Sequence, residues 1–314
     1  MTQNKSLVSV IIPCYNYGHL LHETLDSVIS QTYRNLECIV VDDGSIDNTR
    51  EVAQRYANND FRIKYFYQEN KGLSGARNSG LRIAKGDYIQ LLDADDILSK
   101  AKIQNQVSVL DLQSETDLVY GTVYIFEKDL AAINSAKPFL LQTPPQSGTG
   151  YPVLQALVED NMFLVHCALF RSSIIRDVGY FNESMITCED WNFWFRCALV
   201  GKRFLFVENP ESKVFVRSHG INMSANRKNM WIGKAHFRKE AARLMDAGDD
   251  LVLKKIKARN SQLFREVNTR LQLAYGNIFS GIFDSMKIIF YDRNFFGTIR
   301  DSLYWIKERL LHRV

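Results

Sequence analysis

The sequence predicts an α/β protein with a mostly parallel β-sheet that is flanked by helices and followed by a C-terminal helical extension. Two patterns predict this fold class. Short apolar runs alternate with helical segments over the first hundred residues, and helical periodicity prevails after residue 226. The chain has 314 residues, 46% of them hydrophobic, which is enough to bury a full core in one large domain with an appendage.

Four apolar runs in the N-terminal part are predicted strands, and the segments between them are predicted helices. The first run ends at Pro13, the second is stopped by Asp42, and the fourth leads into Asp93. Asp47 or Ser45 is expected to cap the second helix. The predicted strands are Leu7–Ile12, Leu36–Val41, Ile63–Tyr67 and the run from Tyr88, and the predicted helices are His19–Ser30, the segment after Asp47, and Gly75–Ala84.

Polar side chains follow these strands at their carboxyl ends, where a doubly wound sheet binds its ligands. They are Tyr15 and Asn16 after the first strand, Asp42 and Asp43 after the second, and Asp93 to Asp96 after the fourth. This shared location predicts one binding site at that edge of the sheet.

The pair Asp93 and Asp95 predicts a metal. In an extended chain, side chains two residues apart point the same way, and two close carboxylates repel unless a cation lies between them. Oxygen ligands suit Mg²⁺ or Mn²⁺, which bind through one or two carboxylates together with substrate phosphates. The alternative is a solvated acidic turn after a strand, because Asp is also a turn former.

Other phosphate-binding patterns are absent from the sequence. There is no G-x-x-x-x-G-K-[ST] loop, and the turn after the first strand lacks G-x-G-x-x-G. An EF-hand loop is excluded because its turn glycine and its Glu at position 12 are missing. A diphosphate must therefore be neutralised in another way, for which a metal held by Asp93 and Asp95 is suited.

The cysteines and the hydropathy predict a reduced, cytoplasmic protein. Five cysteines form no C-x-x-C pair and are odd in number, which is typical of free thiols. The first seven residues have no apolar signal region, and no run reaches the roughly 18 apolar residues of a membrane span. We expect a protein that is soluble or peripheral on the inner face of the membrane.

Five motifs in their order and spacing resemble the family 2 glycosyltransferases of the glycosyltransferase-A fold, a Rossmann-like fold. The resemblance covers about residues 6 to 225. The motifs are Val8-Ser-Val-Ile-Ile-Pro-Cys-Tyr-Asn16, Ile39-Val-Val-Asp-Asp-Gly-Ser45, Asn70-Lys-Gly-Leu-Ser-Gly-Ala-Arg-Asn-Ser-Gly80, Asp87-Tyr-Ile-Gln-Leu-Leu-Asp-Ala-Asp-Asp96 and Glu189-Asp-Trp191.

The resemblance implies the roles of the residues on the donor side. Asp95 would bind the metal directly, with Asp93 near the metal or the ribose and His219 as a third ligand. Arg77 would meet the diphosphate or pair with a carboxylate of the acidic cluster, and Tyr15 would lie beside the base or be a surface aromatic. The nucleotide-sugar site would consist of Pro13, Tyr15, Asn16, Asp43, Lys71, Arg77, Asp93 and Ala94.

The same resemblance assigns the general base to Asp190, with Glu189 as its neighbour. An inverting displacement needs a carboxylate that takes the proton of the attacking hydroxyl on the face opposite the leaving diphosphate. The alternative for both residues is an acidic cap, since carboxylates are favoured at a helix N-terminus. Trp191 would line the acceptor side or anchor its helix in the core.

The function implied is transfer of a sugar from a nucleotide-diphosphate sugar to a glycan or lipid-linked acceptor, with inversion and with Mn²⁺ or Mg²⁺. UDP-sugars are favoured modestly. Two alternatives are a nucleotidyltransferase, which normally carries a Gly/Arg/Lys-rich phosphate loop, and a non-catalytic protein that binds sugar or nucleic acid. The acidic pairs are unnecessary for such a binder, so we expect no nucleic-acid partner.

The resemblance divides the chain into a catalytic domain, residues 1–225, and an extension, residues 226–314. Residues 1–110 would bind the nucleotide and residues 111–225 the acceptor. The extension carries 18 Lys and Arg against 9 Asp and Glu. Its two apolar stripes are Phe279, Ile282, Phe283, Met286 and Phe290, and Ile299, Leu303, Ile306 and Leu310, interleaved with Lys287, Arg293, Arg300, Lys307 and Arg309. They predict either contact with an anionic membrane or packing on the catalytic domain or in a homodimer.

Overall fold

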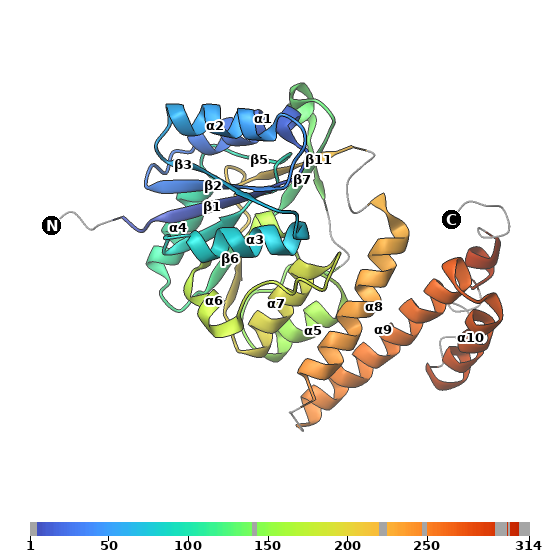
Figure 1. The fold of residues 1–314 in the computed structure, drawn as a ribbon. Coiled ribbons are helices and arrows are strands. Elements are labelled where there is room, and N and C mark those ends of the chain that lie inside the picture. The colour runs from blue at the N-terminus through green and yellow to red at the C-terminus, as the bar shows by residue number, and fades with distance from the viewer. Residues whose placement is uncertain are drawn as a thin grey trace. The chain divides into compact units, whose positions relative to one another are not determined.

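The computed structural model describes residues 5–139, 143–219, 225–246, 250–292, 300 and 302–307. The chain forms two compact units. The first comprises Met1–Ser184 and Phe193–Gly220, and the second comprises Met185–Asn192 and Ile221–Val314. Figure 1 shows the elements of both units along the chain.

The first unit is built on a seven-stranded sheet in the order β10-β6-β9-β4-β1-β2-β3. β9 runs antiparallel to both of its neighbours, and the other pairs are parallel. The mostly parallel sheet predicted from the sequence is therefore confirmed. Its strands are β1 (Val8–Cys14), β2 (Leu36–Asp43), β3 (Ile63–Gln68), β4 (Tyr88–Leu91), β6 (Leu118–Tyr120), β9 (Leu169–Arg171) and β10 (Phe204–Phe206).

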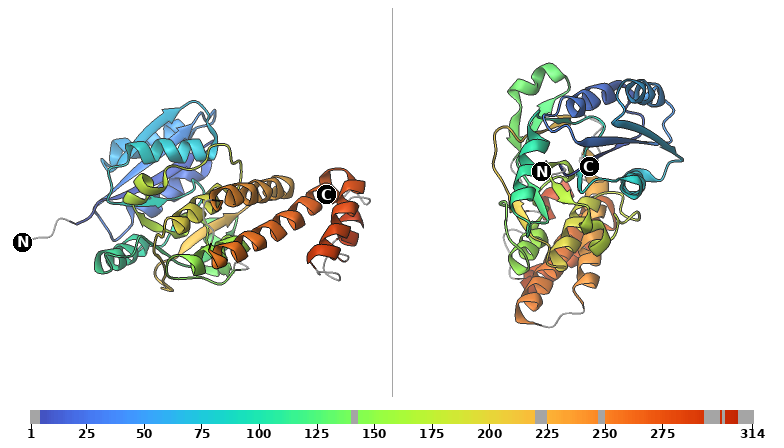
Figure 2. Two further views of the ribbon diagram at one scale, coloured as in Figure 1. Left: turned by 90° about the horizontal axis from the view of Figure 1, so that it is seen from below. Right: turned by 90° about the vertical axis from the view of Figure 1, so that its left-hand side faces the viewer.

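Helices cover both faces of this sheet (Figures 1 and 2). On one face, alternate residues of β1 such as Val10 pack in one cluster with α1 (Gly18–Ile29), α2 (Thr49–Asn59) and α4 (Lys102–Leu112). On the opposite face, Ile11 lies against α3 (Gly72–Ile83). The inner strands β1 and β2 are therefore buried on both sides, which explains their long apolar runs.

Two strands extend beyond their predicted ends. Pro13 lies inside β1, although we expected it to end the strand. The backbone N–H of Leu92 donates to the carbonyl oxygen of Ile11, so the backbone groups of Ile11 face β4. Pro13 lies two residues further on and faces the same side, but the pairing of β1 with β4 ends at Ile11. The missing N–H of proline therefore falls beyond the paired part of this ladder. Asp42 continues β2, because it pairs with Tyr67 of β3.

A second, four-stranded sheet has the order β5-β11-β7-β8. β5 follows the acidic turn directly, and β11 ends one residue before His219. The sheet thus brings two distant parts of the chain together at the predicted metal site. The remaining elements of this unit are β5 (Ile97–Leu98), β7 (Val123–Glu127), β8 (Lys137–Phe139), β11 (Val214–Ser218), α5 (Tyr151–Glu159), α6 (Ser173–Val178) and the 3₁₀ turns η1 (Leu130–Ser135) and η2 (Val165–Cys167).

The second unit is helical, as predicted for the extension. It contains α8 (Arg227–Leu244), α9 (Leu251–Tyr275), α10 (Ile278–Asp292) and the first residues of α7 (Glu189–Leu199). Within the described residues, no helix has both the length and the hydropathy to cross a membrane. Several residues of the predicted stripes lie outside the described residues or have undescribed side chains: Lys287, Phe290, Arg293, Ile299, Arg309 and Leu310.

The contact of α3 with the sheet predicts the effect of a single added methyl group. A Cβ at Gly80 would lie 2.3 Å from Cγ2 of Ile11 and 3.2 Å from Cγ2 of Val41. Overpacking costs about 1–3 kcal/mol, whereas Ala gains up to about 1 kcal/mol over Gly in a helix. We therefore expect Gly80→Ala to lower the free energy of unfolding, measured with urea.

The double variant Gly80→Ala/Ile11→Ala is the control. It should lose less stability than the sum of the two single changes, because Ile11→Ala removes the methyl group in the clash. A Gly80→Ala protein as stable as the wild type would contradict this account of the packing.

Candidate active site

Residues 93–96 form the turn between β4 and β5, at the carboxyl end of the sheet. Asp93 accepts a 2.8 Å hydrogen bond from Nη2 of Arg77, whose side chain is buried in α3. Burial alone would raise the pKa of Asp93, but the charge of Arg77 and its hydrogen bond outweigh this effect and hold the pKa below its usual value. Arg77 thus pairs with a carboxylate of the acidic cluster, which is one of the two partners predicted for it.

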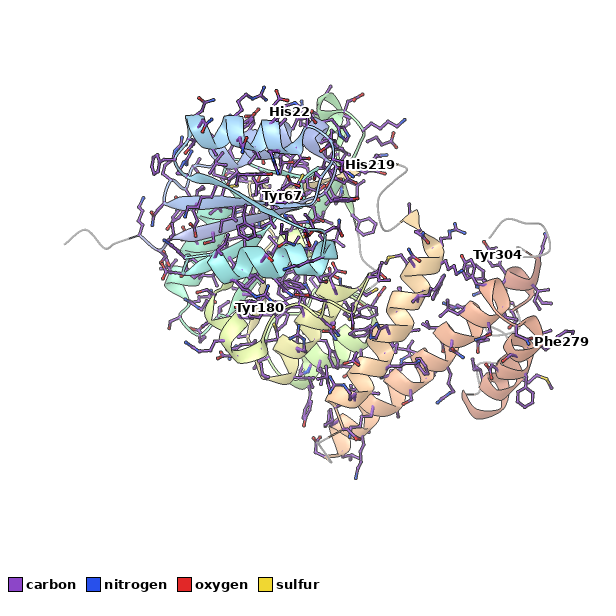
Figure 3. All side chains as sticks on the ribbon, in the orientation of Figure 1. His22, Tyr67, Tyr180, His219, Phe279 and Tyr304 are labelled. Atoms are coloured by element: carbon purple, nitrogen blue, oxygen red, sulfur yellow. The ribbon has the colours of Figure 1, made fainter. Side chains whose placement is uncertain are left out.

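Asp95, on the same turn, contacts His219, which follows β11. Oδ2 of Asp95 lies 2.8 Å from Nε2 of His219, although 124 residues separate them in the sequence. Burial and the neighbouring charge of Asp93 raise the pKa of Asp95, and the contact with His219 offsets this only in part. Figure 3 labels His219 in the loop after β11. The three predicted metal ligands, Asp93, Asp95 and His219, therefore belong to one cluster.

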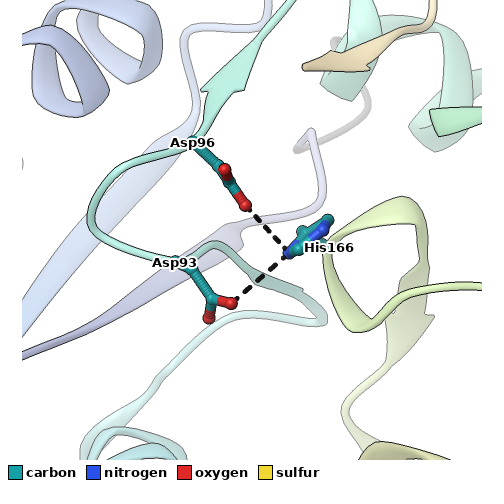
Figure 4. A group of neighbouring side chains, drawn as sticks. All are labelled: Asp93, Asp96 and His166. Carbon is teal, nitrogen blue, oxygen red and sulfur yellow. Dashed lines mark ion pairs between the residues drawn. The ribbon is translucent and has the colours of Figure 1, made fainter. Parts of the chain in front are cut away.

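His166 also faces this cluster, from the 3₁₀ turn η2. Its Nδ1 lies 3.4 Å from Asp96 and 3.7 Å from Asp93, and only 4% of the residue is exposed (Figure 4). Burial lowers the pKa of His166 to about 4, so the ring is neutral at pH 7. A neutral imidazole thus lies between two carboxyl groups.

Asp96 and Arg217 fix the backbone of the turn. Oδ1 of Asp96 accepts a 2.9 Å hydrogen bond from the backbone N–H of Arg217, and Nε of Arg217 donates to the carbonyl oxygen of Asp95 at 3.0 Å. The buried guanidinium also pairs with Glu23 of α1. Burial and the charges of Asp95 and Asp93 raise the pKa of Asp96 well above its usual value.

Three residues at the cluster were not predicted from the sequence: His166, Arg217 and Tyr17. The ring of Tyr17 lies 5.9 Å from that of His219. Burial and the charge of Asp95 raise the pKa of the Tyr17 hydroxyl to about 12. Tyr17 directly follows the first motif and Arg217 lies two residues before His219, which was an available signal. His166 had none, because it lies in a segment whose fold the sequence leaves undefined.

These side chains fit a divalent cation. Asp93, Asp96 and His166 each place a ligand atom within 4.8 Å of the other two, and Asp95 with His219 adds a carboxylate and an imidazole beside them. Such oxygen and nitrogen ligands suit Mn²⁺ and are compatible with Mg²⁺. The raised pKa values of Asp95 and Asp96 indicate negative charge that a cation would offset.

The predicted donor residues line the loops beside this turn. Asn16 has a positive φ of 59°, and its backbone N–H and side-chain oxygen bond to Ser45 and Ile46 of the next loop. Asp43 is buried and accepts hydrogen bonds from Nε2 of Gln68 at 2.6 Å and from the backbone N–H of Lys71 at 2.9 Å. Both residues therefore join neighbouring loops.

Three further residues of the predicted nucleotide-sugar site differ in exposure. Tyr15 is 48% exposed, whereas Pro13 and Ala94 are buried. The carbonyl oxygen of Ala94 accepts a 2.9 Å hydrogen bond from Oγ1 of Thr24. Tyr15 is thus the member of this trio with a large side-chain surface available to a base.

Glu189 and Asp190 begin α7 and belong to the second unit. Glu189 is buried and Asp190 is partly exposed, and the Asp190 carboxylate accepts a 2.7 Å hydrogen bond from the backbone N–H of Trp191. Trp191 is only 1% exposed, and its ring stacks on Phe237 at 3.9 Å. The structure thus has Trp191 as an anchor of its helix, one of its two predicted roles.

Comparison with known proteins places these observations in a family. The model of the family described as "Glycosyl transferase family 2" matches residues 9–179, more than half of the chain. An uncharacterized glycosyltransferase of Rickettsia felis is 34% identical over 194 residues, which are 60% of this chain and 31% of that protein. One from Haemophilus influenzae is 28% identical over 76% of this chain and 90% of its own length. The chain spans about a third of the Rickettsia felis relative.

Two solved structures share the fold. S. aureus TarS 1–349 in complex with UDP-GlcNAc has a TM-score of 0.62 at 18% identity, over 98% of this chain and 83% of that chain. Mannosyltransferase PcManGT from Pyrobaculum calidifontis, in complex with GDP-Man and Mn²⁺, has a TM-score of 0.60 at 19% identity, over 99% and 89%. The predicted glycosyltransferase-A fold is thereby confirmed.

A buried lysine of α4, Lys102, supports the His166 turn through Gln90 of β4. Lys102 is fully buried and donates a hydrogen bond to Oε1 of Gln90, whose Nε2 donates to the carbonyl oxygen of His166 at 3.0 Å. Burial lowers the pKa of Lys102 to about 7. An unfolded lysine has a pKa of about 10.4, so the folded protein binds fewer protons than the unfolded chain between these values.

The stability should therefore rise with pH through that window, and Lys102→Met should remove this dependence. We expect the free energy of unfolding of the variant, minus that of the wild type, to fall as the pH rises from 7 to 10. The lost hydrogen bond to Gln90 costs about 1–3 kcal/mol at every pH and does not change the slope.

Urea titrations at several pH values measure this difference, with Lys100→Met as the control because the side chain of Lys100 is exposed. Equal slopes for the wild type and Lys102→Met would show that Lys102 does not titrate as its burial implies.

Proposed function

The chain belongs to glycosyl transferase family 2, and we propose that it transfers a sugar from a UDP-sugar to an acceptor hydroxyl with inversion, assisted by Mn²⁺ or Mg²⁺. One observation carries the proposal: three carboxylates, two imidazoles and the guanidinium of Arg77 converge on the turn after β4. A nucleoside diphosphate is an anionic leaving group, and this cluster can bind the cation that it needs.

Asp95 and His219 would hold the ion, with Asp93 beside them and His166 next to Asp93. A divalent cation bound there would act as a Lewis acid on the diphosphate oxygens. Arg77 keeps Asp93 ionised, and Arg217 fixes the carbonyl oxygen of Asp95. The PcManGT complex with GDP-Man and Mn²⁺ supports metal use by analogy of fold. The TarS complexes with UDP and UDP-GlcNAc support a uridine donor in the same way.

Asp190 is our candidate for the general base, with Glu189 beside it. Its carboxylate is partly exposed, so an acceptor hydroxyl can reach it. The N-terminus of α7 and the backbone N–H of Trp191 favour its ionised form, which is the form that accepts a proton. A positioned base typically contributes about 10²–10⁴ in rate.

We expect Asp190→Asn to reduce sugar transfer by at least about 10²-fold while it leaves donor and metal binding unchanged. Asp95→Asn should weaken the metal-dependent binding of the donor as well as transfer, because it alters a ligand of the ion. Transfer is assayed as release of the nucleoside diphosphate from a panel of UDP-, GDP- and TDP-sugars, and binding as the Mn²⁺-dependent rise in melting temperature.

Glu115→Gln, a change at an exposed turn residue, is the matched control and should behave as the wild type. An Asp190→Asn protein that transfers sugar at the wild-type rate would reject the base assignment. A panel in which no nucleoside diphosphate raises the melting temperature with Mn²⁺ would reject the transferase proposal itself.

For the extension we propose contact with an anionic membrane, which suits a lipid-linked or cell-surface glycan acceptor. On α10, Phe279 is 80% and Phe283 60% exposed, with Ile282 and Met286 exposed at the adjoining helical positions. Phe279 projects from the helix in Figure 3. A basic chain with an exposed apolar helix face is typical of proteins that bind a lipid surface.

The double change Phe279→Gln/Phe283→Gln should abolish flotation with vesicles of phosphatidylglycerol and phosphatidylcholine, because it removes the inserted apolar area but keeps helix propensity. Leu251→Gln, an exposed apolar residue on α9, is the control. Wild-type protein that does not float, and that sediments as a dimer which the double change dissociates, would favour the homodimer instead.

A further inference from the structure

The turn that carries Glu189 and Asp190 packs against α8 of the extension, inside the second unit. The ring of Trp191, the residue after Asp190, stacks on that of Phe237 with their centres 3.9 Å apart. The guanidinium carbon of Arg238 lies 4.8 Å from the centre of the Trp191 ring. Phe237 and Arg238 are themselves buried, at 0% and 3% exposure. Trp191 is thus enclosed by α8.

Two further contacts join α8 to the start of the same turn. Oγ1 of Thr187 donates a 2.9 Å hydrogen bond to the carbonyl oxygen of Asn229. One turn further along α8, Gly233 leaves room for Thr187: a Cβ there would lie 1.9 Å from its Oγ1 and 2.8 Å from its backbone oxygen. The side chain of Thr187 is therefore held by α8, and its backbone packs closely on Gly233.

Between Thr187 and the acidic pair, Cys188 has a φ of +62°, in the left-handed region that costs energy for residues other than glycine. Its carbonyl oxygen accepts the 3.1 Å hydrogen bond from the backbone N–H of Asn192 that begins α7. A residue keeps such a conformation only where its surroundings impose it. Here the contacts of Thr187 and Trp191 with α8 lie on either side of the strained residue.

We propose that α8 is part of the catalytic apparatus: through Asn229, Gly233, Phe237 and Arg238 it holds the 187–191 turn in the strained form that directs Asp190 to the acceptor. This inference rests on the proposed role of Asp190 as general base. These α8 residues and Thr187 are positioning residues, because none of them needs to touch the substrate. The extension therefore serves catalysis whether or not it also binds a membrane.

Thr187 offers the sharpest test, because two similar replacements separate its hydroxyl from its volume. Thr187→Val keeps the shape but loses the hydrogen bond to Asn229, and Thr187→Ser keeps the hydrogen bond. We expect Thr187→Val to lower kcat by about 10-fold or more with an unchanged KM for the donor, and Thr187→Ser to restore kcat, since misplacement by about 1 Å can cost up to 10²-fold.

Gly233→Ala is the second variant, and it displaces the turn instead of releasing it. Its Cβ must push away the Thr187 backbone, so kcat should fall by a comparable or larger factor. Ile232→Ala, at the neighbouring and 44% exposed position of α8, is the matched control and should keep the wild-type kcat. Melting temperatures, with and without UDP and Mn²⁺, verify that each variant is folded and binds nucleotide.

The outcomes separate this inference from the proposed function. If Asp190→Asn is inactive while folded Thr187→Val and Gly233→Ala keep the wild-type kcat, α8 does not position the base and the inference is wrong. If Thr187→Val and Gly233→Ala lose kcat but also lose donor affinity in equal measure, a general loss of structure explains them and the inference is again rejected. If Asp190→Asn is fully active, the base assignment is wrong, and the inference that rests on it is rejected with it.

Discussion

The crowding of negative charge on the turn after β4 is the constraint on which the candidate site depends. Three carboxyl groups lie within four residues, and the pKa of Asp95 and of Asp96 is raised because burial and mutual repulsion act together. Arg77 compensates Asp93 alone, through a hydrogen bond from α3. The remaining excess is the physical reason to expect a divalent cation, and with it an anionic diphosphate.

The surrounding fold maintains this unfavourable cluster instead of relieving it. Arg217 holds the backbone of the turn by bonds to Asp95 and Asp96, and the neutral ring of His166 occupies the space between the carboxyl groups. Behind His166, Gln90 links its backbone to the buried Lys102. The fold thus keeps an electrostatically unfavourable cluster in place, as is common at functional sites.

The carboxylates of Glu189 and Asp190 follow a different principle. Both lie in the first turn of α7, and their placement depends on a strained residue and on an aromatic stack with α8. The extension, which composition alone marks as a basic appendage, thereby supplies packing to the turn with the candidate base. An interpretation of the extension as a membrane element only would overlook this contact.

The sequence by itself determined the fold class and the family, because alternating apolar runs set the sheet and because Asp93, Asp95, Asp190 and their motifs are local patterns. For Arg77 it left two anionic partners open, the diphosphate and a carboxylate of the acidic cluster. Only the tertiary structure decided that His166 faces Asp93 and Asp96, that Arg217 fixes the turn, and that Trp191 is enclosed by α8. These contacts join segments far apart in the chain, and neither periodicity nor spacing records which distant segments meet. They are set by strand order and helix packing, which depend on the whole core at once.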